Sequence, residues 1–210
     1  MTTRSAPLWP LILSCVLGGL GLFLARQAGD GTPVFYALTV VTATVYAAAW
    51  WMWGDRSAFT GPAGADIARG AGIGAVLALV FMGGALVVRR IPLLAGPVEE
   101  LLNMPQAGGW VPTLTVLIIN GIGEELVYRD AVPKQLRGRL SELGVGIVST
   151  LIYCAVTIAM GVPLLVFAAG VLGAVCFYEA SRSGRLYSPI AVHLTWSTVM
   201  LLVMPLIITR

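Results

Sequence analysis

The sequence predicts an all-α fold, a polytopic bundle of transmembrane helices. Of the 210 residues, 58% are hydrophobic and only 11% are charged, and the mean hydropathy is +0.88. These values lie far outside the range of ordinary soluble domains. The apolar residues also gather into about seven runs, each long enough to cross a bilayer core of about 30 Å as a helix of roughly 20 residues.

The expected spans follow one another closely along the chain. They cover residues 8–25, 32–53, 70–88, 110–128, 143–160, 162–180 and 187–207. The first is kept as a span because LFLARQAGD lacks the small-x-small cleavage site of a signal peptide. Gly161 and Pro163 separate the fifth span from the sixth, although these two spans could also form one broken unit. Where glycines recur inside a span, as at Gly70 and Gly74, we expect close packing between helices.

Two segments between the spans are expected to stay at the membrane surfaces. Residues 91–109 are too interrupted by proline and glycine to span, and they predict an outer-face loop with a short interfacial helix. Residues 134–143, KQLRGRLSEL, predict a short amphipathic piece on the cytoplasmic surface.

The basic residues predict how the chain is oriented. Nine of them fall on the side of the N-terminus and four on the opposite side, which favours a cytoplasmic N-terminus. We expect an integral protein of the plasma membrane. The net charge of +3 does not suggest a nucleic-acid partner, because the basic residues stand in short clusters between apolar runs. The three cysteines, Cys15, Cys154 and Cys176, all lie in apolar runs and are expected to be core residues.

Two adjacent glutamates follow an apolar run in the segment IINGIGEELVYRD, residues 118–130. On a helix, Glu125 and Arg129 form an i, i+4 pair, while Glu124 points about 100° away. Glu124 would then share a face with Asn120 and Tyr128. One interpretation is a buried structural cluster of charges. The other is a functional site, because a charge at the membrane centre costs about 2.5 to 3.5 kcal/mol to insert.

The only histidine, His193, lies six residues into the last expected span. In the orientation above it enters from the cytoplasmic side, so it could meet the glutamates. Glu179 is expected to reach the interface instead. One histidine excludes an HExxH zinc protease, and neither a GxSG nor a GxGD motif is present. The remaining chemistry, without metal or cofactor, is a carboxylate base on water and a histidine that polarises the substrate carbonyl.

The segment EELVYR, residues 124–129, resembles the EExxxR motif of the CPBP family, which includes CAAX prenyl endopeptidases and bacteriocin-immunity proteins. The second family motif, FxxxH, matches YCAVT, in which Tyr153 and Thr157 occupy the motif positions. The third, a histidine followed four places on by asparagine, matches HLTWS, from His193 to Ser197. The resemblance implies a CPBP-type core in residues 110–210, preceded by N-terminal helices and an outer loop in residues 1–109.

The resemblance also implies residue roles. In the family, the first glutamate and the second-motif histidine activate water, and the third-motif histidine and asparagine stabilise the oxyanion. Glu124 would be the base and His193 the oxyanion donor, but Thr157 and Ser197 depart from the pattern. Loss of an oxyanion donor costs about 10² to 10³ in rate, and loss of a general base about 10² to 10⁴.

Two functions of different class therefore follow. One is a glutamate-dependent intramembrane endopeptidase that acts on a membrane-embedded or prenylated peptide. The other, which we favour because of Thr157, is a pseudoprotease that binds or scaffolds another membrane protein. A proton-coupled transporter that uses Glu124 is a third possibility, although no inverted repeat is visible. The depth of Thr157, about 21 Å into the fifth span, also requires either a later start of that span or a different site.

Overall fold

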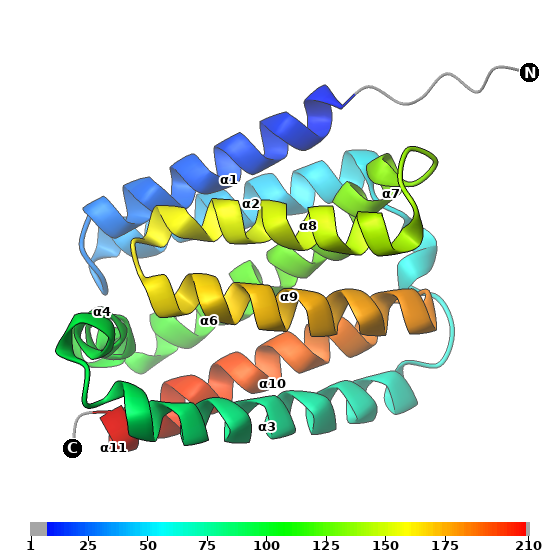
Figure 1. Ribbon diagram of the computed structural model, residues 1–210. Helices are drawn as coiled ribbons and strands as arrows, with labels where there is room; N and C mark the ends of the chain where they lie inside the picture. The colour runs from blue at the N-terminus through cyan, green and yellow to red at the C-terminus, as the bar shows by residue number, and fades with distance from the viewer. Residues whose placement is uncertain (1–7, 209–210) are drawn as a thin grey trace, which may run out of the picture.

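The structure, a computed structural model, describes residues 8–208 and contains helices and turns throughout that range, with no strand. Figure 1 shows the helices as a bundle of long rods with short helices at its two ends. The long helices are α1 (Trp9–Gln27), α2 (Pro33–Trp53), α3 (Ala63–Val88), α6 (Trp110–Leu126), α8 (Glu142–Thr157), α9 (Pro163–Ser183) and α10 (Tyr187–Val203). The short ones are α4 (Pro92–Leu102), α5 (Met104–Gly108), α7 (Val132–Leu136) and α11 (Pro205–Ile208).

The polytopic helical bundle is confirmed. In the described part of the chain, six helices are long and apolar enough to cross a membrane, one of them running from Trp110 to Leu136 through α6 and α7. The seventh expected span is the shorter apolar helix Tyr187–Val203. Residues 1–7, which were predicted to be cytoplasmic, lie outside the described residues.

The ends of several spans differ from the prediction. α3 begins at Ala63 rather than residue 70, and its added turns carry Asp66, which pairs with Arg185, and Arg69, which pairs with Glu179 of α9. The last span ends at Val203, before Pro205 opens α11. Spans five and six are separate helices. Gly161 between them has a φ of +68°, a conformation that suits glycine, and Pro163 begins α9.

The fourth span does not end near residue 128 as predicted. Residues Val127–Ala131 form a π-turn, in which the Val132 N–H donates to the Val127 carbonyl, and α7 continues the helix to Leu136. Pro133 gives the physical reason, because it has no N–H to donate to the Arg129 carbonyl in an α-helix. Residues 134–136 therefore belong to this helix, and the predicted amphipathic surface piece is reduced to the turn before α8.

Close glycine contacts hold α3 against α10. A Cβ added at Gly70 would lie 2.3 Å from the Ser188 carbonyl oxygen, and one added at Gly74 would lie 2.5 Å from the Val192 carbonyl oxygen. Only glycine allows the two backbones to approach this closely, as the sequence predicted. α10 packs against α3, α6 and α9, and so His193 is brought beside the glutamates of α6.

The segment 91–109 is not a span. It forms α4 and α5, two short helices at one end of the bundle (Figure 1). Glu100 of α4 pairs with Arg26 at the end of α1, with 2.8 Å between Oε2 and Nη2. Arg26 also contacts Asp30, so these charges tie α4 to the α1–α2 connection.

Candidate functional site

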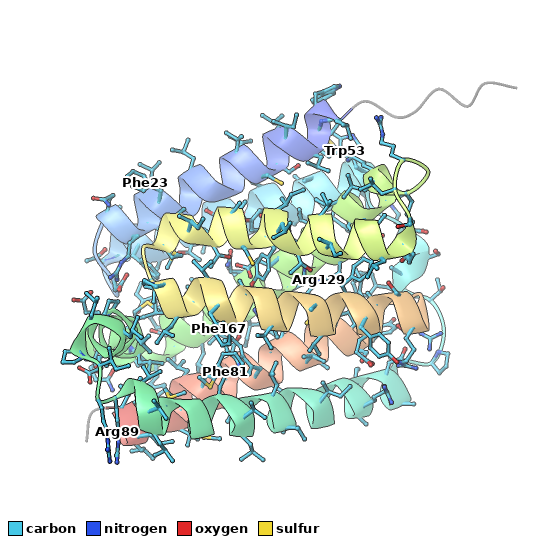
Figure 2. The ribbon with its side chains drawn as sticks, in the orientation of Figure 1. Phe23, Trp53, Phe81, Arg89, Arg129 and Phe167 are labelled. Atoms are coloured by element: carbon cyan, nitrogen blue, oxygen red, sulfur yellow. The ribbon has the colours of Figure 1, made fainter. Side chains whose placement is uncertain are left out.

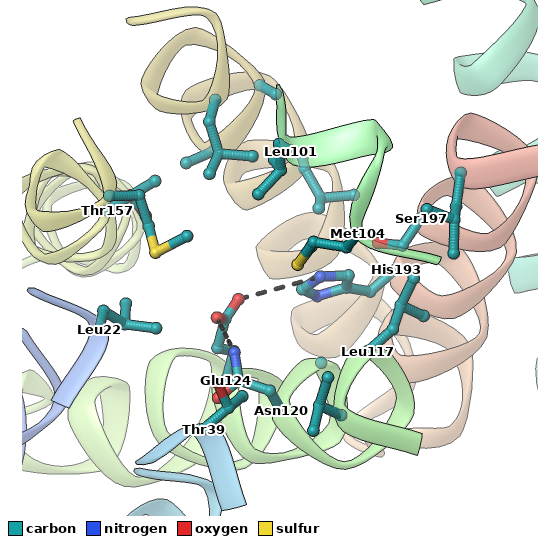
Figure 3. Close-up of a pocket in the computed structure, with 18 of the residues that line it drawn as sticks. Leu22, Thr39, Leu101, Met104, Leu117, Asn120, Glu124, Thr157, His193 and Ser197 are labelled. Atoms are coloured by element: carbon teal, nitrogen blue, oxygen red, sulfur yellow. Dashed lines mark hydrogen bonds and ion pairs between the residues drawn. The ribbon is translucent and has the colours of Figure 1, made fainter. Parts of the chain in front are cut away.

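The two glutamates of α6 have different partners. The Asn120 side-chain amide donates to Oε1 of Glu124 at 2.7 Å, and the Tyr153 hydroxyl donates to Oε2 at 2.6 Å. Figure 3 shows Asn120 and Glu124 on one side of the pocket and His193 facing them. Glu124 and Asn120 therefore lie on one face of α6, as predicted. The Tyr128 hydroxyl pairs with Tyr46 at 3.0 Å rather than with Glu124, and the Tyr128 ring packs against Tyr153.

Glu125 is fully buried between a histidine and an arginine. Its Oε1 lies 2.8 Å from Nδ1 of His193, and its Oε2 lies 3.3 Å from Nε of Arg129. The Arg129 guanidinium also lies over the Tyr153 ring, 4.8 Å from its centroid. The expected i, i+4 pair is present, and its two charges offset one another where water is excluded. Figure 2 shows Arg129 within the bundle.

His193 connects the two carboxylates. Its Nδ1 faces Glu125, and its Nε2 lies 3.9 Å from Oε2 of Glu124 (Figure 3). An ionised carboxylate only accepts hydrogen bonds, so Nδ1 must carry the proton when Glu125 is ionised. In the neutral ring, Nε2 then has a lone pair toward Glu124. In the imidazolium form both nitrogens donate.

A cavity of about 230 Å³ lies between these groups. Its lining includes Glu124, Tyr153, Thr157, His193 and Ser197. Of the predicted site residues, only the buried pair Glu125 and Arg129 does not line it. Helices of the N-terminal segment also line it, through Leu22, Thr39 and Leu101 (Figure 3). The division at residue 109 thus separates parts of the chain that share one cavity.

The positions of Thr157 and Glu124 are compatible in depth. Thr157 lies fifteen residues after the start of α8 at Glu142, or about 22 Å. Glu124 lies twelve residues before the end of the fourth span at Leu136, or about 18 Å. The apparent mismatch arose from ending the fourth span too early. The Thr157 hydroxyl, however, donates to the Tyr153 carbonyl at 2.8 Å rather than to another side chain.

Two features escaped the sequence prediction. The Tyr153 hydroxyl is a partner of Glu124, and the signal was a tyrosine where the family motif has phenylalanine. Glu179 lies near the end of α9, but its carboxylate is not exposed there. It is buried, and Arg69, Arg182 and Ser188 all donate to its carboxylate. Within residues 8–208, no group of three or more His, Cys, Asp or Glu side chains is arranged to hold a metal ion.

One comparison with known proteins finds a match over the segment that carries most of these residues. Residues 106–199 match the family model described as type II CAAX prenyl endopeptidase Rce1-like. This segment of the chain is similar to Rce1-like proteins. The matched segment contains the two glutamates, Arg129 and His193, and it confirms the resemblance to the CPBP family. No curated protein matches the chain significantly, and neither does any solved structure.

Proposed function

We propose that this chain is an Rce1-like pseudoprotease, which binds a membrane-embedded peptide or a helix of another membrane protein without cleaving it. The observation that carries the proposal is the hydrogen bond that the Thr157 side chain donates to its own helix. This residue stands where the family resemblance puts the water-activating histidine, and its hydroxyl donates to the Tyr153 carbonyl at 2.8 Å. A threonine bound in this way to its own helix does not accept a proton at neutral pH as imidazole does.

The contacts of Glu124 support the same proposal. Both of its carboxylate oxygens already accept a hydrogen bond, one from Asn120 and one from Tyr153. Each donor takes one of the two lone-pair positions of the oxygen that it contacts, which leaves fewer positions for an attacking water. In the pseudoprotease, Glu124 and Glu125 hold the polar cluster together, and the cavity receives the partner.

One observation favours an active endopeptidase as a second candidate. Nε2 of His193 and Oε2 of Glu124 are 3.9 Å apart, and both residues line the cavity. A water about 2.8 Å from each atom would contact both. That water would attack the peptide carbonyl carbon and lose a proton to Glu124 or His193, and the proton would then pass to the leaving amine.

In that second candidate, the contact with Glu125 changes the role of His193. Because Nδ1 faces Glu125, the neutral ring offers an acceptor toward the cavity. His193 would then act as a base beside Glu124 rather than as the oxyanion donor that the resemblance implies. As an oxyanion donor it would have to be an imidazolium.

A cleavage assay separates the two candidates. The purified protein would be reconstituted into liposomes with a prenylated peptide and, separately, with a transmembrane peptide. The pseudoprotease is expected to leave both intact, while Thr157→His with Ser197→Asn cleaves one of them. Cleavage by the unmodified protein that Glu124→Gln abolishes would instead establish the endopeptidase.

A binding assay tests the other half of the proposal. Ala168 lines the cavity and is buried, so Ala168→Phe should reduce crosslinking of either peptide to the protein. Val111→Phe is the matched control, because Val111 is 78% exposed on the outside of the bundle. Equal crosslinking in both variants would contradict binding in this cavity.

We also propose that the protein lies in the plasma membrane with its N-terminus in the cytoplasm. The asymmetry of the basic residues supports this orientation. The end of the bundle that carries Lys134, Arg137, Arg139, Arg182 and Arg185 would then face the cytoplasm.

A further inference from the structure

A second hollow lies on the outside of the bundle, between α3 and α9. Its volume is about 460 Å³, and it is lined by seven residues of α3 between Ala68 and Val80 and by Val175 of α9. None of these residues lines the polar cavity. Val76 and Val80 are 61% and 64% exposed, so the groove faces the lipid side of a membrane-spanning bundle.

One end of the groove carries a group of charges from three elements. Arg69 donates through Nε and Nη2 to the Glu179 carboxylate, at 2.9 and 3.0 Å. Arg182 contacts both Glu179 and Asp66, and Arg185 pairs with Asp66 at 2.6 Å. Three arginines thus face two carboxylates, which leaves a net charge of +1.

The positive groups of this cluster are more exposed than the carboxylates. The Glu179 and Asp66 side chains are 1% and 7% exposed, whereas the Arg69 side chain is 47% exposed. Arg69 lines the groove, and among the described residues its Nη1 makes no hydrogen bond. A guanidinium in this setting attracts phosphate oxygens, which it binds through its N–H groups.

The apolar part of the groove has the length of one leaflet. From Arg69 to Val80 the helix rises over eleven residues, or about 16 Å, which is close to half of the bilayer core of about 30 Å. Gly72 lies in the lining, and a Cβ added there would meet no atom within 4 Å. An acyl chain that starts at Arg69 would therefore reach about the midplane.

We propose that this groove binds an anionic phospholipid, with its phosphate at Arg69 and one acyl chain along α3. The positive charge at one end and the leaflet-length apolar surface beyond it together fit this ligand class. The site is independent of the proposed function, because it shares no residue with the polar cavity. One uncompensated arginine near the membrane surface is expected to favour anionic over zwitterionic lipid about fivefold.

Native mass spectrometry of the purified full chain tests the proposal. The protein would be released from micelles that contain equal amounts of dioleoyl phosphatidylglycerol and dioleoyl phosphatidylcholine. We expect one retained phosphatidylglycerol per chain, at about five times the level of phosphatidylcholine. Arg69→Gln should remove this preference.

A pair of glycine variants separates lipid binding from stability. Gly72→Leu fills the groove and leaves the ion pairs intact, so it should remove the retained lipid. Gly83→Leu is the control, because Gly83 is also in α3, also has open space beside it and does not line the groove. Equal retention of the two lipids by the parent protein would overturn the proposal. So would undiminished retention in Gly72→Leu, or a dimer that occupies this face.

Discussion

The Tyr153 hydroxyl donates a hydrogen bond of 2.6 Å to Oε2 of Glu124. The same oxygen is the one nearest to Nε2 of His193, at 3.9 Å. Any water between the glutamate and the histidine would therefore share one carboxylate oxygen with the phenol. The identity of residue 153 accordingly bears on catalysis as much as that of Thr157.

Removing this phenol should increase a restored activity. We expect Tyr153→Phe, added to Thr157→His and Ser197→Asn, to cleave a prenylated or transmembrane peptide faster than the double variant. The reason is that phenylalanine frees Oε2 of Glu124 for water and completes the FxxxH motif. A gain of about tenfold would be well within what a positioned base contributes. Initial rates of peptide cleavage in liposomes measure the effect.

Glu124→Gln in the triple variant is the control for that experiment. It should return the rate to background, because the amide does not accept the proton from water. Activity that survives Glu124→Gln would contradict the role of Glu124 as the base, and would leave His193 and the imidazole introduced by Thr157→His to activate the water.

Arg129→Ala should act through folding. The change leaves Glu125 buried without its arginine, at a cost of about 3 to 5 kcal/mol. We expect low abundance in membranes and a lower melting temperature in detergent. Arg137→Ala is the matched control, because Arg137 and Glu142 are about half exposed and such pairs contribute about 0 to 1 kcal/mol. Normal accumulation and parent-like melting of Arg129→Ala would show that the buried pair is dispensable.

Gly70→Leu should separate α3 from α10. The new side chain would meet the Ser188 carbonyl and Ala191, and overpacking of this kind costs about 1 to 3 kcal/mol or more. Gly83→Leu, in open space on the same helix, should not lower stability. Thermal unfolding of both variants in one detergent provides the comparison. Equal melting temperatures would exclude tight backbone contact at Gly70.

Cysteine labelling tests the orientation. In a background without the three native cysteines, Ser141→Cys should react with a membrane-impermeant maleimide only after the inner face is opened. Gln106→Cys, in the segment expected on the outer face, should react in intact cells. Both residues are exposed. The reverse pattern of labelling would overturn the topology.

The sequence was sufficient to predict the bundle, the non-spanning segment 91–109 and the approach of His193 to the glutamates. Span length and hydropathy predict the helices because a segment that crosses lipid must satisfy its backbone hydrogen bonds internally. The pairing of Glu125 with Arg129 followed from helix geometry alone.

Long-range partners could not be predicted in this way. Glu179 was expected at the interface because it stands near the end of its span, and its main partner, Arg69, is 110 residues away in the chain. The link between Tyr153 and Glu124 likewise depends on how α8 packs beside α6. The fourth span was ended too early because Lys134 and Arg137 look like surface residues, whereas the π-turn carries the helix on to Leu136.

The π-turn at Val127–Ala131 makes the site sensitive to insertions and deletions. It holds one residue more per turn than an α-helix, so deleting a single residue there would turn α6 by about 100° relative to α7. Glu124 and Glu125 would then lose their contacts with His193, although the chain would still contain every residue of the site. Homologous chains that share this chemistry should therefore vary in length at the exposed turn around Gly138 rather than between Glu125 and Pro133.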